Sequence, residues 1–241
     1  MTIPTPTTQK ANPKNTLTGI LARAGQILFM FIFLGLVLFV GSGNIHWTAA
    51  WVYLGISLLS VAINATFMLR TNPETVAERG RAKGWKDWDK TISGLYALVQ
   101  YLILPLVAAL DQRFGWSGEI GLIWHLVGAS VYAFSLGLSG WAMISNAYFS
   151  TAARIQSDRG QQVCRSGPYR FLRHPGYSAF IVQSVSMAIL LGSLWALIPA
   201  ILTGGLMVTR TALEDRMLLQ ELAGYADYAQ EIKYRLLPGI W

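Results

Sequence analysis

The sequence predicts an all-α, polytopic membrane helix bundle of about five to six transmembrane helices, followed by a C-terminal amphipathic helix in the cytoplasm. The first supporting observation is the composition: 53% of the residues are hydrophobic and only 13% are charged, and the mean hydropathy is +0.41. A soluble domain carries nearer to a quarter charged residues. The second observation is a series of long apolar runs, and the third is the gathering of basic residues in alternate connections between them.

The apolar runs follow one another along the chain, and most approach the roughly 20 residues that a spanning helix needs. The last two are shorter and meet at Gly192-Ser193, so we expect a tight helical hairpin that is tilted or spans incompletely. Five full helices plus a re-entrant segment fit the sequence as well. A cleaved signal peptide is the weaker interpretation of the first run, because no convincing small-residue cleavage site follows it. The runs cover residues 25–40, 47–69, 92–110, 120–144, 177–191 and 194–208.

Three regions are expected along the chain. Residues 1–17 are rich in Thr, Pro, Asn and Lys without an apolar period, which predicts a disordered tail. Residues 18–145 hold the N-terminal transmembrane helices, and residues 146–241 hold the polar segments that point to a site. The connection at residues 70–90 reads as a short interfacial amphipathic helix or, favoured by its pattern, as a solvated loop with tryptophan anchors.

The basic residues predict the orientation in the membrane. With six crossings, 18 of the 19 Lys and Arg residues fall on one side, and only Arg113 falls on the other. The positive-inside rule therefore places both termini and residues 166–177 in the cytoplasm, in an inner or plasma membrane. The net charge of +7 is then mainly a topology signal with modest attraction to anionic lipid headgroups, and it is weak evidence for nucleic acid as a partner.

Residues 166–177, Ser-Gly-Pro-Tyr-Arg-Phe-Leu-Arg-His-Pro-Gly-Tyr, place three cations and two phenols at the start of an apolar run. Backbone and ionisable groups are costly in hydrocarbon. Pro175 and Gly176 open a membrane helix beside Arg173 and His174, which implies an aqueous cavity or a bound polar ligand. The alternative interpretation is a positively charged loop with ordinary helix-start residues.

A second polar cluster lies in the C-terminal third. Arg210 and Glu214 are four residues apart and would share one helical face. This pattern fits an ordinary surface ion pair, or a helix that closes over residues 166–177 and surrounds one cavity with a carboxylate, cations and phenols. The residues that recur at helical spacing in the expected amphipathic helix are Leu218, Leu222, Tyr225 and Ile232.

Other site chemistries find little support in the sequence. Cys164 is the single cysteine, which excludes an intramolecular disulfide and a cysteine-cluster metal site. His46, His125 and His174 are too scattered to predict a metal site by spacing. There is no Gly-x-Ser-x-Gly elbow and no Gly-x-Gly-x-x-Gly fingerprint, so a hydrolase or a soluble dinucleotide fold is disfavoured.

The polar motifs together, in their order along the chain, resemble the integral membrane methyltransferases related to isoprenylcysteine carboxyl methyltransferase and the phospholipid N-methyltransferases. The resemblance covers about residues 146–241. It departs at Asp215, where the family often has Glu. The matching residues are Ser166-Gly167-Pro168-Tyr169-Arg170, Arg173-His174-Pro175 with Tyr177, Arg210 with Glu214-Asp215, and Tyr225, Tyr228, Tyr234-Arg235 and Pro238.

The resemblance implies that residues 146–241 form an S-adenosylmethionine-binding catalytic region, and that a lipophilic acceptor enters from the membrane. A sulfonium is stabilised by a carboxylate and aromatic faces, and the methionyl carboxylate needs cations or donors. The implied catalytic residues are Arg173 and Glu214; the implied cofactor contacts are Tyr169, His174, Pro175, Tyr177, Arg210 and Tyr228; the implied acceptor contacts are Asn146 and Phe149.

The acceptor is left open between a prenylcysteine-type carboxylate, which is most like the family, a phospholipid amine and a small thiol. Two other classes are weaker. Membrane sterol reductases resemble this family in their C-terminal architecture and use NADPH. A transporter or scaffold would carry functional polar residues at mid-membrane, where the apolar runs offer little beyond Asn64 and Gln100. We expect a lipid or lipophilic partner, no nucleic acid and no metal; the oligomeric state is not indicated.

Overall fold

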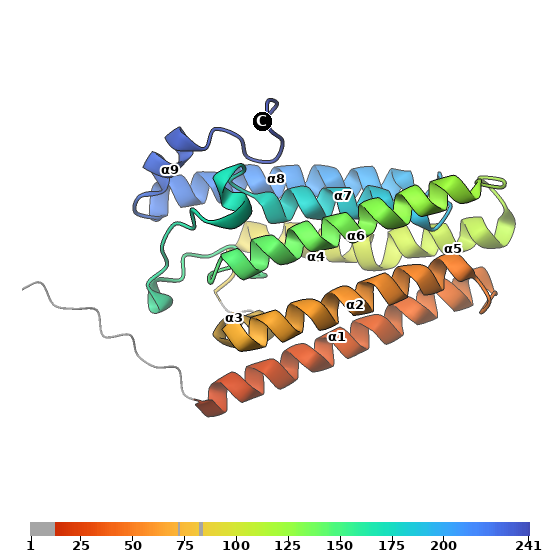
Figure 1. The fold of residues 1–241 in the computed structure, drawn as a ribbon, viewed down its shortest axis with the longest axis horizontal. Coiled ribbons are helices and arrows are strands. Elements are labelled where there is room, and N and C mark those ends of the chain that lie inside the picture. The colour runs from red at the N-terminus through yellow and green to blue at the C-terminus, as the bar shows by residue number, and fades with distance from the viewer. Residues whose placement is uncertain (1–12, 72, 82–83) are drawn as a thin grey trace, which may run out of the picture.

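The computed structural model describes residues 13–71, 73–81 and 84–241. In this part of the chain, six long helical segments run alternately up and down as one bundle (Figure 1). The third segment is continuous but changes type along its length. The long segments are α1 (Pro13–Ser42), α2 (Thr48–Thr71), α4 (Asp87–Leu98) with η1 (Val99–Ile103) and α5 (Leu104–Phe114), α6 (Leu122–Ser145), α7 (Pro175–Leu190) and α8 (Leu197–Glu221). The short helices are α3 (Pro73–Arg81), η2 (Ser157–Arg159), η3 (Gly167–Arg170) and α9 (Tyr225–Glu231).

The all-α membrane bundle predicted from the sequence is confirmed. Among the residues that the structure describes, four helices are long and apolar enough to cross a membrane: residues 16–42, 48–71, 87–114 and 122–145. Helix α7 is apolar but has 16 residues, about 24 Å at 1.5 Å per residue, which is short of the roughly 30 Å hydrocarbon thickness. Large apolar side chains on α1 and α2 are exposed, which fits helices that face lipid rather than water.

Close helix packing explains the small residues on α6. A Cβ at Gly128 would overlap the backbone of Leu190 on α7, and a Cβ at Gly140 would overlap the side-chain amide of Asn64 on α2. Gly137 meets nothing within 4 Å, so it is not a packing contact. Glycine at two positions therefore lets α6 lie against both neighbours, as small residues do in membrane helix pairs.

Buried polar side chains in the bundle find partners within it. Ser184 donates to Gln100 Oε1 at 2.6 Å where the chain forms the π-helical turn η1. At the end opposite α3 and α9, Ser193 donates to Asp111 Oδ2 at 2.5 Å, and the Ser117 N–H donates to Oδ1 at 2.7 Å. These bonds join the α5–α6 connection to the α7–α8 connection. They also supply Asp111 with donors, without which a buried carboxylate would be costly.

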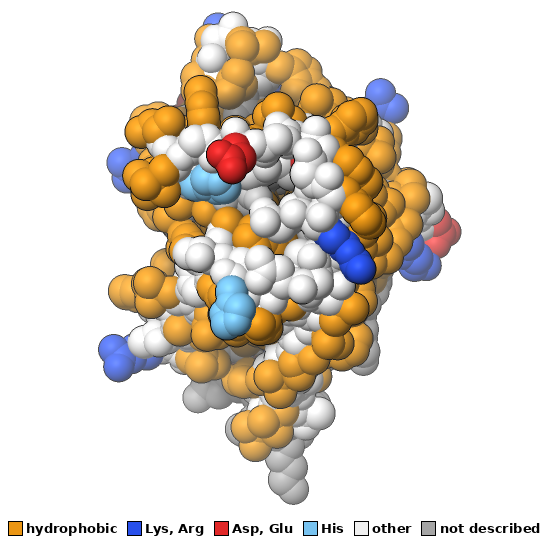
Figure 2. Space-filling model, turned by 90° about the vertical axis from the view of Figure 1, so that its right-hand side faces the viewer, with side chains coloured by type: hydrophobic (Ala, Val, Ile, Leu, Met, Phe, Trp, Pro, Cys, Tyr) orange, Lys and Arg blue, Asp and Glu red, His pale blue; other side chains and the backbone are white. Residues whose placement is uncertain are grey.

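The two ends of the bundle differ in charge. The first turn of α1, helices α3 and α9, and the start of α7 all lie at one end, while α5 and Arg113 reach the other (Figure 1). Lys and Arg side chains are sparse on the second end (Figure 2). The end with α3 and α9 is called the pocket end below. The sequence predicts that this end faces the cytoplasm.

Three local expectations differ from the structure. Residues 73–81 form a helix whose Thr75 and Ala77 are buried, so the favoured loop interpretation was wrong. Helix α1 begins at Pro13, inside the stretch predicted as a tail, and residues 1–12 lie outside the described residues. The C-terminal amphipathic helix is not continuous: α8 runs to Glu221, Gly224 adopts φ +77°, and α9 then starts in a new direction. A positive φ is a conformation that glycine adopts at little cost.

Candidate active site

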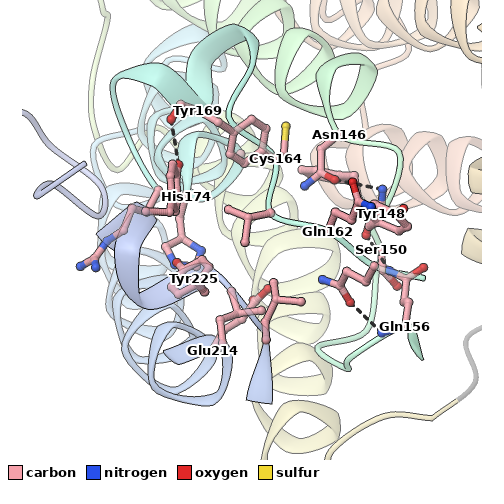
Figure 3. A pocket seen from close by; sticks show the side chains of 18 of the residues that line it. Asn146, Tyr148, Ser150, Gln156, Gln162, Cys164, Tyr169, His174, Glu214 and Tyr225 are labelled. Atoms are coloured by element: carbon pink, nitrogen blue, oxygen red, sulfur yellow. Dashed lines mark hydrogen bonds between the residues drawn. The ribbon is translucent and has the colours of Figure 1, made fainter. Parts of the chain in front are cut away.

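A polar pocket opens at the pocket end, where α6 stops and α7 begins (Figure 3). Counted together with the open mouth, its empty space is about 780 Å³. The loop after α6 forms one wall, η3 and the start of α7 form the second, and α8 with α9 form the third. The lining residues that the argument uses are Asn146, Phe149, Tyr169, Arg173, His174, Tyr177, Glu214, Tyr225 and Tyr228.

Asp215 is the centre of an ion-pair network behind the pocket, and it is fully buried. Tyr225 donates its hydroxyl to Asp215 Oδ1 at 2.8 Å, and Arg235 Nε donates to Oδ2 at 2.8 Å. His174 Nε2 lies 3.3 Å from Oδ1, and Arg173 Nη2 lies 3.3 Å from Oδ2. One carboxylate on α8 therefore joins the start of α7, helix α9 and the C-terminal segment.

The charge state of Asp215 follows from these partners. Burial opposes its ionisation, but hydrogen bonds from His174, Arg235 and Tyr225 outweigh burial and hold the pKa of Asp215 below its usual range. Asp215 is thus a permanent anion at neutral pH.

Backbone pairing seals the network on its outer side. The N–H groups of Arg173 and His174 donate to the carbonyls of Tyr234 and Arg235 at 3.0 and 2.9 Å. Ser178 Oγ donates to the Leu236 carbonyl at 2.6 Å. These bonds satisfy backbone groups just before α7, where Pro175 has no N–H to offer. Residues 234–236, which follow α9, therefore pair with the start of α7, whereas the sequence offered closure of residues 166–177 by the amphipathic helix itself as one of two interpretations.

Glu214, the neighbour of Asp215, faces the pocket instead. Its Oε2 accepts a hydrogen bond from the Tyr177 hydroxyl. The ring of Tyr177 stacks on His174 with centroids 5.7 Å apart and planes 4° apart. A carboxylate and parallel aromatic rings therefore lie side by side on one wall of the pocket.

Arg210 is placed differently from the sequence interpretation. It pairs with Asp89 on α4 through Nε to Oδ1 at 2.8 Å and Nη2 to Oδ2 at 3.3 Å, and Nη2 also donates to the Thr151 carbonyl at 2.9 Å. Its guanidinium lies 5.1 Å from the ring centroid of Tyr177. Arg210 does not line the pocket, so it does not make the direct cofactor contact that the resemblance implied and instead supports the ring of Tyr177 from behind. The surface pair of Arg210 with Glu214, one of the two interpretations of the sequence, is replaced by a buried pair with Asp89.

Two phenols close the inner part of the pocket. Tyr228 on α9 donates to the Tyr169 carbonyl at 2.8 Å. Burial raises the pKa of both Tyr169 and Tyr228 well above that of a free phenol. Both phenols therefore remain neutral, and their rings offer aromatic faces to a ligand.

The wall opposite Glu214 is the loop after α6, which carries the predicted acceptor contacts Asn146 and Phe149 (Figure 3). The Asn146 side-chain oxygen accepts from the Tyr148 N–H at 2.9 Å, and Gln156 Nε2 donates to the Tyr148 carbonyl at 2.7 Å. Phe149 packs on Gly176, where a Cβ would lie 2.8 Å from the ring. In Figure 3, Asn146, Tyr148 and Gln156 lie across the cavity from Glu214. The loop after α6 thus presents amide groups and the Phe149 ring to the pocket, whereas the opposite side presents the Glu214 carboxylate.

The structure brings most predicted site residues together and leaves two outside. Pro175 and Arg210 do not line the pocket, although both lie directly behind residues that do. Sequence reasoning missed Asp215 and Asp89 as organisers. Asp215 was noted as a member of the acidic pair and as a departure from the family pattern but not as a site residue, and nothing local marks Asp89 as the partner of a residue 121 positions away. The residues that line the pocket as predicted are Asn146, Phe149, Tyr169, Arg173, His174, Tyr177, Glu214 and Tyr228.

Metal ligation finds no support in the part of the chain that the structure describes. No group of three or more His, Cys, Asp or Glu side chains there is arranged to hold a metal ion. The polar groups that line the pocket are instead the Glu214 carboxylate, the guanidinium groups of Arg154 and Arg173, the His174 imidazole, and several amides and phenols. Such a set suits an organic molecule that carries both a positive and a negative group.

Fold and pocket together define an integral membrane protein with a polar ligand site at one end of a helix bundle. Residues 128–220 match the model of the Isoprenylcysteine carboxyl methyltransferase (ICMT) family. The chain is therefore related to this family, as the sequence motifs predict. The match runs from the middle of α6 to the end of α8 and includes every pocket wall except α9.

Curated relatives agree with the family match. Two proteins, from Oryza sativa subsp. indica and Oryza sativa subsp. japonica, are each called "Probable protein-S-isoprenylcysteine O-methyltransferase". Each is 21% identical to this chain over 139 residues, which is 57% of this chain and 70% of the relative.

Proposed function

We propose that this protein is a membrane-embedded, S-adenosylmethionine-dependent methyltransferase that acts on a lipophilic acceptor, with a prenylcysteine-type carboxylate as the first candidate. One observation carries the proposal: the family match covers all the pocket-lining residues except Leu222, Tyr225 and Tyr228, and within it Glu214 and Arg173 offer opposite charges to one ligand. The proteins with the same family resemblance carry names that describe methyl transfer to isoprenylcysteine.

The residues present fit this cofactor. When bound, S-adenosylmethionine supplies a methyl group on a sulfonium, which an acceptor oxygen, nitrogen or sulfur takes up in line with the departing sulfur. Glu214 supplies the negative charge that a sulfonium requires, and Tyr169, Tyr177 and Tyr228 supply aromatic faces that attract cations. These groups belong to η3, α7, α8 and α9.

Arg173 and His174 are the candidates for the methionyl carboxylate. Both are at least 90% buried and both line the pocket. Asp215 neutralises part of their charge but fixes their positions, because it contacts both side chains from behind. A planar guanidinium held in this way is preorganised to bind a carboxylate.

The protein's main contribution is alignment and exclusion of water. Methyl transfer to a carboxylate needs no deprotonation, whereas an amine or thiol must first lose a proton. Asn146 and Phe149 form the opposite wall and are the candidates for holding the acceptor. Fixing the two molecules in one geometry removes much of the entropic barrier to their reaction.

The test is methyl transfer by purified protein in lipid nanodiscs with isotopically labelled S-adenosylmethionine. Parallel reactions receive an S-farnesylated cysteine derivative, phosphatidylethanolamine or a small alkyl thiol, and mass spectrometry locates the label. We expect label in the carboxyl ester of the first acceptor. Label found only in phosphatidylethanolamine or only in the thiol would show that the acceptor is an amine or a thiol instead of a carboxylate. Binding of NADPH without binding of S-adenosylmethionine, measured by isothermal titration, would overturn the methyltransferase proposal.

A further inference from the structure

Helix α3 lies between α1 and the loop after α6, which forms one wall of the pocket. Gly19 on α1 lies so close to α3 that a Cβ there would come within 2.7 Å of the Ala77 carbonyl oxygen. On its other side, Thr75 donates to the Ala147 carbonyl at 2.5 Å, and Arg159 Nη2 donates to the same carbonyl at 3.0 Å. The position of α3 is therefore fixed relative to both the membrane helix and the loop after α6.

Arg79 on α3 carries a charge that no described side chain neutralises. Its guanidinium lies 5.3 Å from the ring centroid of Phe149, which lines the pocket. The Nη1 atom is buried and has no hydrogen-bond partner. Among the described residues no carboxylate forms an ion pair with Arg79, and the aromatic ring accepts no strong hydrogen bond in compensation.

A second arginine, Arg23, lies one helical turn after Gly19 on the same face of α1, the face that packs on α3. Arg23 on α1 is half-buried and donates to Gln26 Oε1 at 3.3 Å. Burial, and then the neighbouring positive charge of Arg23, lower the pKa of Arg79 to about 10. Two like charges close together in a partly buried site are unfavourable unless an anion joins them.

The depth of this pair identifies the kind of anion. Arg23 lies within the apolar span of α1 that begins at Thr16 and two residues before the apolar run at residues 25–40, so it stands at the boundary between headgroups and hydrocarbon. A lipid phosphate lies at that level with its chains in hydrocarbon, whereas a soluble anion would gain no contact with the apolar surface beside the pair. The exposed apolar side chains Leu17, Leu21 and Leu28 on α1 provide a surface for those chains.

We propose that Arg79 and Arg23 form a binding site for the headgroup of an anionic phospholipid, between α1 and α3 at the pocket end. The bound phosphate accepts from the orphaned donor of Arg79 and separates the two positive charges. Because Arg79 lies against Phe149, the lipid also holds the wall opposite Glu214 in place. This site lies outside the family match and does not depend on the methyltransferase proposal.

Native mass spectrometry of the full chain, released from nanodiscs with equal amounts of phosphatidylglycerol and phosphatidylcholine, tests the site. We expect wild type to retain phosphatidylglycerol preferentially, and Arg79→Gln and Arg23→Gln each to lower the retained fraction at least about fivefold. The matched control is Arg70→Gln, which removes an equal charge from an exposed position at the same end and should retain lipid as wild type does.

Two results would overturn the proposal. One is an equal, small loss in Arg79→Gln, Arg23→Gln and Arg70→Gln, which would assign lipid retention to general surface charge. The other is displacement of phosphatidylglycerol by millimolar inorganic phosphate, which would make the site one for a soluble anion. Thermal unfolding in pure phosphatidylcholine reports folding separately: because Arg79 is uncompensated there, Arg79→Gln should unfold no earlier than wild type.

Discussion

Arg210 on α8 and Asp89 on α4 form a buried ion pair, with Nε and Oδ1 2.8 Å apart and both side chains at most 8% exposed. Asp89 also accepts the Ala153 N–H at 2.6 Å and the Ser93 hydroxyl at 3.2 Å. The pair therefore joins α4, α8 and the loop after α6. It also places the Arg210 guanidinium against the ring of Tyr177, whose hydroxyl binds Glu214.

Asp89→Asn should destabilise the protein by about 3 to 5 kcal/mol, because it leaves the buried charge of Arg210 without its counter-ion. Thermal unfolding in nanodiscs measures the loss. Asp87→Asn is the matched control: the Asp87 side chain is 96% exposed and pairs only with Lys90 across one helical turn, so its removal should change stability by less than about 1 kcal/mol. Similar unfolding temperatures for the two variants would show that the Asp89 pair does not hold the helices together.

Asp215→Asn should weaken attachment of the C-terminal segment and make the stability less sensitive to acid. The pKa of Asp215 is lowered in the folded state, so its contribution to stability is complete above the ordinary aspartate pKa of about 3.9. That contribution is lost as the pH falls further, through the folded-state pKa. The stability difference between wild type and Asp215→Asn is therefore expected to be large at pH 7 and to shrink below about pH 4.

Limited proteolysis provides a local measurement of the same change. Cleavage after Lys233, which is exposed, should be faster in Asp215→Asn because an amide has one acceptor oxygen and no charge, so it cannot hold both Arg235 and Tyr225 as the carboxylate does. A pH-independent stability difference, or unchanged cleavage, would contradict the central role of Asp215.

Glu214→Gln should weaken S-adenosylmethionine binding by about 1 to 3 kcal/mol, since the sulfonium loses its counter-ion while the Tyr177 hydroxyl keeps an acceptor. Isothermal titration measures the affinity. Glu221→Gln, seven residues later on the same helix, removes a half-exposed carboxylate that pairs with Lys86 at 2.9 Å and should bind as wild type does. Equal affinities for wild type and Glu214→Gln would remove Glu214 from the cofactor site.

Arg173→Lys should lower cofactor affinity at least about tenfold, roughly 1.4 kcal/mol, because an ammonium cannot reproduce the planar guanidinium fork. Arg170→Lys is the matched control, since Arg170 is exposed and lies only three residues away. Arg159 is less suitable, because its guanidinium donates to Gln156 Oε1 at 2.6 Å and supports the pocket loop. Small and equal effects at positions 173 and 170 would show that residues 166–177 are a positively charged membrane-face loop and that Arg173 does not bind the cofactor.

Cysteine labelling tests the orientation in the membrane. In a Cys164→Ser background, Lys233→Cys at the pocket end and Glu119→Cys at the opposite end both replace exposed residues. A membrane-impermeant maleimide applied to intact cells should label Glu119→Cys only, because the positive-inside rule places the pocket end in the cytoplasm. Labelling of Lys233→Cys alone would reverse the topology.

Much of the site could be predicted from sequence because its residues are concentrated in two short stretches. The Arg173-His174-Pro175 motif signals polar groups at a helix start, and the Arg210 to Asp215 stretch signals polar groups at the end of another helix. Their meeting was expected because antiparallel neighbours return to the same membrane face. Which member of the acidic pair faces the pocket was not predictable, because adjacent helical positions differ by 100° and the orientation of α8 depends on its neighbours.

The sequence by itself determined the helix bundle, its membrane location and the end at which the polar residues gather. Each of these follows from hydropathy and charge along the chain, which are local properties. The tertiary structure alone decided that Asp89 pairs with Arg210 and that Asp215 joins four partners. It also decided that α3 is a buried helix and that Gly224 breaks the C-terminal helix. Those features depend on which side chains meet across separations of up to 121 residues, and a buried charge chooses its partner by proximity in space rather than along the chain.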